Sequence, residues 1–147
     1  MTPAERAEKS AAAMWSGDQA SAWFGMALIA VDEGSATLAL TVQPHHVNGH
    51  QICHGGVVFA LADSAFAFAC NSRNQATVAQ HNTITYLAPA RLGDRLTASA
   101  REVSLKGRSG ITDVTVTDQN GHTVAVFRGA SRAITGQLFS EEEEATS

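Results

Sequence analysis

The sequence predicts an α+β domain in which one long, buried helix is wrapped by a curved antiparallel β-sheet of about six strands. From Asn48 to Asn71, a polar loop rich in His and Gly leads into an apolar segment too long and too rich in Ala and Phe for a strand. Short strand-like runs flank this segment. A helix that is apolar nearly all round must be buried, and a curled sheet can bury it within a chain of 147 residues.

The first residues predict two helices. Residues 3–15 are rich in alanine, with Thr2 as a cap and Pro3 suited to the first turn. A shorter helix is expected over residues 18–24, with Asp18 as its cap. The sequence leaves open whether these helices cover an edge of the sheet or line a pocket.

Two strands are expected before the central helix. Residues 26–31 are apolar at every position, which predicts a strand buried on both faces. After a turn at residues 32–34, residues 36–42 alternate in a way that predicts one polar face. Pro44 ends this strand, and residues 45–56 form the polar loop.

Four strands are expected after the central helix, which should cover residues 57–70 and end near Asn71 to Asn74. Turn signals separate the strands, and Asn120-Gly121 between two alternating runs is the strongest hairpin signal. The expected strands span residues 78–87, 95–105, 109–117 and 123–134.

The chain is therefore divided into a helical extension (residues 1–24), the α+β domain (residues 25–136) and an acidic tail (residues 137–147). Four consecutive glutamates, Glu141–Glu144, predict that the tail is disordered. An open sheet of this size leaves edges to cover, so a homo-oligomer is expected.

Composition excludes several classes of protein. A hydrophobic content of 44% and a charged content of 16% fit a soluble globular domain. The net charge of −4 and the scattered basic residues argue against a nucleic-acid partner.

We see no secretory signal and no run of the roughly 18 apolar residues that a membrane helix needs. On a helix, Cys53 and Cys70 would lie roughly 25 Å apart, too far for a disulfide. We expect a cytoplasmic protein without a membrane partner.

Asp63 is the one carboxylate within the apolar segment. An isolated carboxylate among Ala, Leu and Phe side chains is costly to desolvate unless a hydrogen bond compensates. One interpretation places Asp63 on a solvated stripe beside Ser64. The other makes Asp63 a catalytic group.

The run His54-Gly55-Gly56 lies where the helix should begin. The first turn of a helix has free backbone N–H groups and the positive end of the helix dipole. Glycine lets a ligand oxygen approach that backbone closely. This arrangement can form an oxyanion hole for acyl transfer, although a flexible helix cap is the alternative.

Gly55 and Asp63 are eight residues apart, which is roughly 12 Å along a helix. The N–H group that binds a substrate carbonyl and the group that attacks it must both lie within about 3–3.5 Å of that carbonyl. One helix cannot easily supply both, whereas two antiparallel helices from two subunits can. We therefore predict a composite active site at a two-fold dimer interface, with Gly55 of one subunit facing Asp63 of the other.

The polar loop has the residue types of a metal site, because four histidines and one cysteine fall within ten residues: His45, His46, His50, Cys53 and His54. Their spacing matches no standard zinc pattern, and no second ligand pair stands out. No metal is expected, and the loop is expected to orient a substrate carbonyl, a role that Asn48 can share. The chain also lacks a G-x-S-x-G elbow, a P-loop and a G-x-G-x-x-G motif.

The runs NGHQICHGGVVFALADSAFAFACNS and QHNTITYLAPARLGD resemble the PaaI-type thioesterases of the hotdog-fold superfamily. The likeness covers about residues 25–134. The resemblance implies a hotdog fold and homodimers that pair into a homotetramer. It also implies a hydrolase that cleaves acyl-CoA thioesters, such as phenylacetyl-CoA or hydroxyphenylacetyl-CoA in phenylacetate degradation.

Carried over by this resemblance, the Gly55 N–H polarises the thioester carbonyl, and His54 and Asn48 help to position substrate and water. Asp63 of the facing subunit is the nucleophile or general base. The resemblance implies no cofactor, because coenzyme A is part of the substrate. A hydroxyl that helps to hold the water in some relatives aligns with Ala79 here.

Further residues are candidates for binding the substrate. Gly56 and Thr77 are expected near the thioester, and the phosphates of coenzyme A need cationic or N–H donors. The basic turn is the first candidate for these phosphates and Arg91 the second, although an ordinary solvated turn is the alternative. The turn candidates are Lys106, Arg108, Ser109 and Gly110.

Two other functions stay open at this point. One is a hotdog enoyl-CoA hydratase or dehydratase, in which His54 or His81 would pair with the acid across the dimer. The other is a non-catalytic acyl-CoA-binding module. Asp63 argues against the second, because a pure binder gains nothing from a buried carboxylate near a carbonyl.

Overall fold

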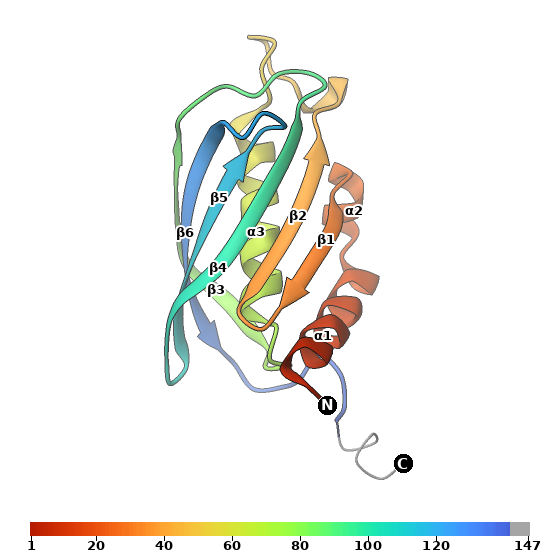
Figure 1. Ribbon diagram of the computed structural model, residues 1–147, viewed down its shortest axis with the longest axis vertical. Coiled ribbons are helices and arrows are strands. Elements are labelled where there is room, and N and C mark those ends of the chain that lie inside the picture. Colours follow the sequence, from red (N-terminus) through yellow and green to blue (C-terminus); the bar gives the residue numbers. More distant parts are fainter. Residues whose placement is uncertain (142–147) are drawn as a thin grey trace.

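A six-stranded antiparallel sheet curls around one long helix in the computed structural model, which describes residues 1–141 (Figure 1). The central helix is α3 (Gly55–Cys70), and two helices precede the sheet, α1 (Pro3–Gly17) and α2 (Gln19–Phe24). The other elements are β1 (Ala27–Asp32), β2 (Ser35–Thr41), the 3-10 turn η1 (Pro44–His46), β3 (Thr77–Tyr86), β4 (Arg95–Lys106), β5 (Ser109–Thr117) and β6 (Thr123–Ala133).

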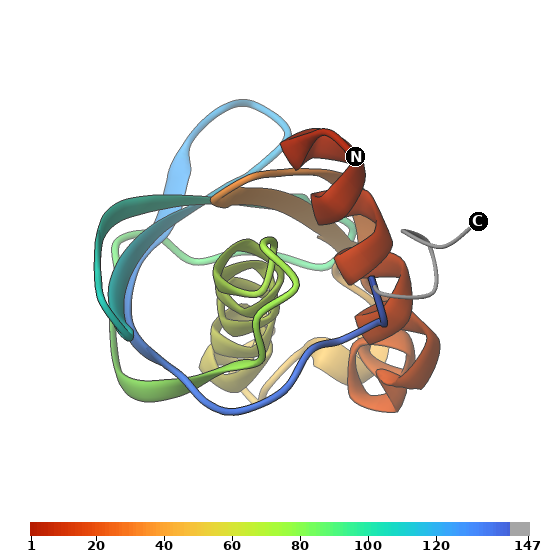
Figure 2. The ribbon, with the colours of Figure 1, turned by 90° about the horizontal axis from the view of Figure 1, so that it is seen from below.

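The strands lie in the order β1-β2-β4-β5-β6-β3, so β1 and β3 form the two edges. Each neighbouring pair is antiparallel. Bulges interrupt the β3–β6 register near Gln80 and the β4–β5 register near Val103, and bulges bend and twist strands. Seen along the helix, the sheet curves around α3 (Figure 2). The fold class predicted from the sequence is confirmed.

The core consists of α3 and the concave face of the sheet. Within α3 one side, which carries Asp63 and Ser64, stays partly exposed, and the other sides are buried. The buried residues are Val57, Val58, Leu61, Ala62, Ala65, Phe66, Phe68, Ala69 and Cys70. Phe66 fits against the sheet only because β6 has a glycine at position 129. A Cβ atom added to Gly129 would lie 2.5 Å from Cε2 of Phe66.

The N-terminal helices cover the side of the molecule next to β1 (Figure 2). Thr2 Oγ1 accepts the Glu5 N–H at 3.1 Å and caps α1, while Asp18 Oδ1 accepts the Ser21 N–H at 2.9 Å and caps α2. The Trp15 ring of α1 packs against Phe68 of α3, with the ring centroids 6.0 Å apart. The extension therefore covers the sheet and the central helix.

The prediction that residues 26–31 form a strand buried on both faces is wrong. This strand, β1, is an edge strand, and the Ile29 side chain is 54% exposed. A strand that is apolar at every position can be a central strand, but it can also be an edge strand with one face covered by a helix.

The segment after β6 passes from the sheet to α1 (Figure 2). Asn74 Oδ1 accepts the N–H groups of Leu138 and Phe139 at 2.9 and 3.0 Å, and Arg6 pairs with Glu141 at 2.9 Å. These contacts hold the first part of the predicted acidic tail against the domain. The predicted disorder of residues 142–147 lies outside the described residues. Within residues 1–141, no helix combines the length and apolarity needed to cross a membrane.

Replacing Gly129 with alanine should destabilise the fold, because the new methyl group collides with the buried Phe66 ring. We expect the free energy of unfolding to fall by about 1–3 kcal/mol in urea denaturation. The matched control is Gly17→Ala, where an added Cβ meets nothing within 4 Å, and where no loss is expected. Equal stability of the two variants would contradict this account of the core.

Candidate active site

The polar loop ends in a capped helix start. His54 is the N-cap residue of α3, and its Nδ1 atom accepts the Gly56 N–H at 2.8 Å. Because Nδ1 accepts, the neutral imidazole carries its proton on Nε2. The Gly55 N–H has no acceptor among the described residues. The free donor at the helix start is thus Gly55, the residue predicted to bind a carbonyl.

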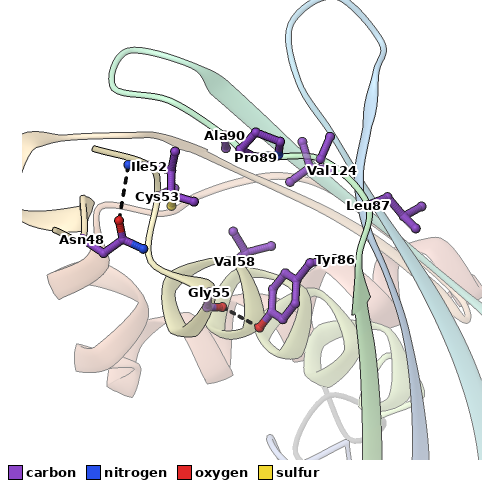
Figure 3. A pocket seen from close by; sticks show the side chains of 11 residues that line it. Asn48, Ile52, Cys53, Gly55, Val58, Tyr86, Leu87, Pro89, Ala90 and Val124 are labelled. Carbon is purple, nitrogen blue, oxygen red and sulfur yellow. Dashed lines mark hydrogen bonds between the residues drawn. The ribbon is translucent and has the colours of Figure 1, made fainter. Parts of the chain in front are cut away.

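Gly55 and Asn48 line the same cavity, which has a volume of about 330 Å³ (Figure 3). Asn48 Oδ1 accepts the N–H groups of His50 and Ile52 at 2.9 and 3.4 Å. This use of the oxygen leaves the amide nitrogen of Asn48 without an acceptor among the described residues, so it can serve as a donor. The rest of the wall is mostly apolar, and it includes Val58, Leu87, Pro89 and Val124.

Tyr86, at the end of β3, also lines this cavity. Its hydroxyl donates a hydrogen bond to the Gly55 carbonyl oxygen at 2.8 Å (Figure 3). Burial raises the pKa of Tyr86, so the hydroxyl stays protonated and can donate at neutral pH. A Cβ atom on Gly55 would lie 3.2 Å from this ring, so glycine allows the close approach.

Asp63 lies two turns further along α3 and does not line this cavity. Its carboxylate is partly buried, and the amide of Asn82 on β3 donates to Asp63 Oδ1 at 3.1 Å. Burial raises the pKa of Asp63, and the Asn82 hydrogen bond opposes this shift. Asp63 and the neighbouring Ser64 are both partly exposed, and the Ser64 hydroxyl is bonded to Ser21 at 2.9 Å, so Asp63 lies on the side of α3 that is only partly covered.

Sequence reasoning missed Asn82. A signal was present, because side chains two residues apart on a strand share a face. Ile84 and Tyr86 of β3 turn toward α3, and the same alternation places Asn82 on that face. A polar residue among apolar ones on a strand that faces a lone carboxylate points to a hydrogen bond.

The other loop residues shape the backbone. His46 is buried, its Nδ1 accepts the Gln43 N–H at 2.9 Å, and its carbonyl accepts the His54 N–H at 2.8 Å. Burial raises the pKa of the Cys53 thiol to about 11, so this thiol is protonated and a poor nucleophile at neutral pH. Among the described residues, no group of three or more His, Cys, Asp or Glu side chains is arranged to hold a metal ion.

The predicted phosphate contacts fall in two places. The β4–β5 turn with Lys106, Arg108, Ser109 and Gly110 lies at the end of the molecule opposite the start of α3 (Figure 1). Arg108 lines a separate cavity of about 400 Å³ there. Arg91 instead forms a β-bridge with Ile52, which lines the Gly55 cavity.

Thr77 forms its hydrogen bonds with residues of the connection between α3 and β3. Its hydroxyl donates to the Gln75 carbonyl at 2.8 Å, and its backbone N–H and carbonyl both bond the Asn71 side chain. These contacts close the connection between α3 and β3. Thr77 therefore does not lie with Gly55 in one site of the single chain.

Comparison with known proteins identifies the family. Residues 50–125 match the family model of the thioesterase superfamily, and this segment contains Gly55, Asp63 and Asn82. The chain belongs to this family. It is 43% identical over 136 residues to the acyl-coenzyme A thioesterase PaaI of Escherichia coli K12, an alignment that covers 92% of this chain and 97% of that protein. The predicted likeness to the PaaI-type thioesterases is therefore confirmed.

Solved structures give the same result. The structure of the E. coli PaaI protein superposes with a TM-score of 0.91 at 42% identity, covering 92% of this chain and 99% of that chain. A Streptococcus mutans protein solved with acetyl CoA gives a TM-score of 0.72 at 27% identity, covering 76% and 90%. The curled sheet around α3 is the hotdog fold that the resemblance implied.

Replacing His54 with alanine should remove the acceptor for the Gly56 N–H and weaken the start of α3. We expect the free energy of unfolding to fall by about 1 kcal/mol, measured by thermal or urea denaturation. His54→Asn keeps a capping oxygen and should lose less. The control is His50→Ala, an exposed residue of the same loop. If His54→Ala were as stable as His50→Ala, the cap would not contribute to stability.

Proposed function

We propose that this chain hydrolyses acyl-CoA thioesters to a free acid and coenzyme A. The observation that carries the proposal is the free Gly55 N–H at the start of α3, in the wall of a mostly apolar cavity beside Asn48. Membership of the thioesterase superfamily and the 43% identity to an acyl-CoA thioesterase support this chemistry.

The thioester carbonyl oxygen would accept from the Gly55 N–H, with the Asn48 amide as a second donor. Negative charge develops on this oxygen as the carbonyl carbon is attacked. Donors at the positive end of a helix dipole stabilise that charge without having to reorganise. The Tyr86 bond to the Gly55 carbonyl fixes the peptide backbone from which the helix starts.

Asp63 supplies the attacking chemistry. In one route its carboxylate takes a proton from water, the hydroxyl attacks the carbonyl carbon, and the C–S bond breaks to release the thiolate of coenzyme A. In the other route Asp63 itself attacks and forms an anhydride, which water then hydrolyses. Single turnover in ¹⁸O-labelled water separates them, because only the covalent route places the label in the Asp63 carboxyl.

Asp63 and Gly55 of one chain lie two turns apart on a straight helix, so they cannot flank one carbonyl. We propose that Gly55 of one subunit works with Asp63 of the facing subunit in a homodimer, and that dimers pair into a homotetramer. The edge strand β3 carries Asn82 and Tyr86 and has β6 as its only neighbour in the described chain, which leaves an edge for a second subunit.

The proposed substrates are aryl-acyl-CoA esters such as phenylacetyl-CoA or hydroxyphenylacetyl-CoA. The apolar wall of the Gly55 cavity suits a ring, and Arg91 beside it suits a phosphate. Thiol release over a panel of aromatic and aliphatic CoA esters tests this preference. No metal or bound cofactor takes part in the proposed reaction, and the cytoplasmic location stays a prediction.

The hydratase alternative needs a histidine paired with the acid across the dimer, and His54 and His81 are the candidates. Within one chain, the hydrogen-bond partner of Asp63 is Asn82, and His54 Nδ1 accepts the Gly56 N–H. A saturated acyl-CoA distinguishes the functions, because only a thioesterase releases free thiol from it. Tight binding of the ester without thiol release would indicate a binding module.

Replacing Asp63 with asparagine should leave the fold intact and lower turnover about a hundredfold or more, because the amide can neither attack nor accept a proton. Thiol release from an aryl-acyl-CoA measures the rate, and the thermal midpoint checks the fold. Wild-type turnover by the purified variant would overturn the assignment of Asp63.

Gly55→Pro should also abolish activity, because proline has no N–H. The backbone accepts proline here, since Gly55 is the first helical residue and His54 has a ψ of 135°. Gly55→Ala is the matched control, because it adds a Cβ near Tyr86 but keeps the N–H.

Mixing the two inactive variants tests the composite site. A heterodimer of Gly55→Pro and Asp63→Asn subunits contains one site with both groups intact. Random assembly should therefore restore about a quarter of the wild-type rate. Failure of coexpressed, purified heterodimers to recover activity would show that both groups act within one chain.

A further inference from the structure

We infer that Asn82 is a positioning residue, which holds the Asp63 carboxylate in a fixed orientation for the proposed reaction. Its Nδ2 atom donates to Asp63 Oδ1 at 3.1 Å, and this bond leaves Oδ2 for the reacting water or carbonyl carbon. The inference rests on the proposed function, because it gives Asn82 a role through Asp63.

Two side chains of β3 form hydrogen bonds with α3, one at each of the two proposed reactive positions of the helix. Tyr86 bonds the Gly55 carbonyl, and Asn82 bonds the Asp63 carboxylate. Four residues of strand span about 13 Å, and eight residues of helix span about 12 Å. The two elements therefore match in length, and one rigid strand sets the position of both groups.

Asp63 is partly exposed, and buried apolar residues of α3, Ala62 and Ala65, lie next to it in the chain. Phe66 lies one turn further along the same side of α3, and its ring fills the space beside Gly129. Gly129 is the residue that pairs with Asn82 across the β3–β6 ladder. In the described chain, the Asn82 amide is thus the hydrogen-bond donor that compensates the partial burial of the Asp63 carboxylate.

An asparagine at this partly buried place has a cost. Its Oδ1 atom is buried and has no hydrogen-bond partner among the described residues. Turning the amide over would not help, because the carbonyl oxygen would then face the carboxylate. An apolar side chain would avoid this unpaired oxygen, so the hydrogen bond to Asp63 is the benefit that offsets it.

The other titratable groups near Asp63 do not take over the role of the Asn82 hydrogen bond. Burial raises the pKa of Asp63, and the hydrogen bond from Asn82 lowers it. On α3, Cys70 has its pKa raised to about 12 by burial first and in small part by Glu102 of β4 and Asp63, so its thiol is neutral. His81 is exposed and adjoins Asn82 on β3, where alternation turns it to the opposite face.

The test compares Asn82→Leu with Thr83→Leu, an exposed neighbour on the opposite face of β3. For each, the rate of thiol release is measured across pH, together with the thermal midpoint. Loss of the donor should raise the pKa of Asp63. The ionised carboxylate is the active form and is lost as pH falls through its pKa, so the acid limb should move to higher pH.

We expect the Asn82→Leu limb to move up by about one pH unit, which is about a tenfold loss of kcat/KM at the acid end. The difference should shrink toward the alkaline end, and the thermal midpoint should not fall. Thr83→Leu should follow the wild-type profile. Asn82→Asp, which places a second carboxylate beside the first, should move the limb further in the same direction.

Two results would overturn the inference. One is an Asn82→Leu profile identical to wild type. The other is an equal loss at every pH with a lowered thermal midpoint, since that is the signature of a purely structural residue. Asp63→Asn separates the inference from the proposed function. If Asp63→Asn is inactive while Asn82→Leu matches wild type, only the role of Asn82 fails; if Asp63→Asn is fully active, the proposed function of Asp63 fails.

Discussion

The burial of α3 is the constraint on which the rest of the structure depends. A helix that is apolar on nearly every side needs cover all round, and the sheet provides it by curling, with bulges in β3 and β4 and a glycine at position 129 where Phe66 enters. The N-terminal helices and the segment after β6 cover the side that the sheet leaves open. Among the described residues, α3 stays partly exposed at its capped start and along the side that carries Asp63, Ser64 and Ala67, and a ligand can reach the helix there.

The same burial sets the chemistry of the two reactive positions. At the start of the helix, His54 takes the Gly56 N–H and leaves the Gly55 N–H without an acceptor, so one donor faces the cavity. In the middle of the helix, desolvation disfavours the charge on Asp63, and Asn82 counters it. A reactive carboxylate needs both effects, because burial strengthens its basicity while a hydrogen bond keeps enough of it ionised near neutral pH.

Much of this could be predicted from the sequence, because the decisive patterns are local. The alternation of β2, the Asn120-Gly121 turn, the Thr2 and Asp18 caps and the apolar run of α3 each determine an element on their own. Contacts between distant elements could not be read in this way. Three features depend on the assembled sheet: the exposure of β1, the Asn82–Asp63 bond and the Tyr86–Gly55 bond. They depend on which strands become edges and on how β3 lies along α3, and these are determined only when the sheet has folded around the helix.

The straightness of α3 explains why one chain cannot complete the proposed site (Figure 1). Gly55 and Asp63 are held by two bonds to one strand, so the distance between them cannot shrink by bending either element. A flexible loop carrying one of the groups could have closed over a substrate within a single chain. Here both groups are fixed on rigid elements, which favours precise geometry but prevents them from meeting. A second copy of the helix, running in the opposite direction, removes the conflict without loosening either group, and this is the physical reason why the proposed catalyst is a dimer.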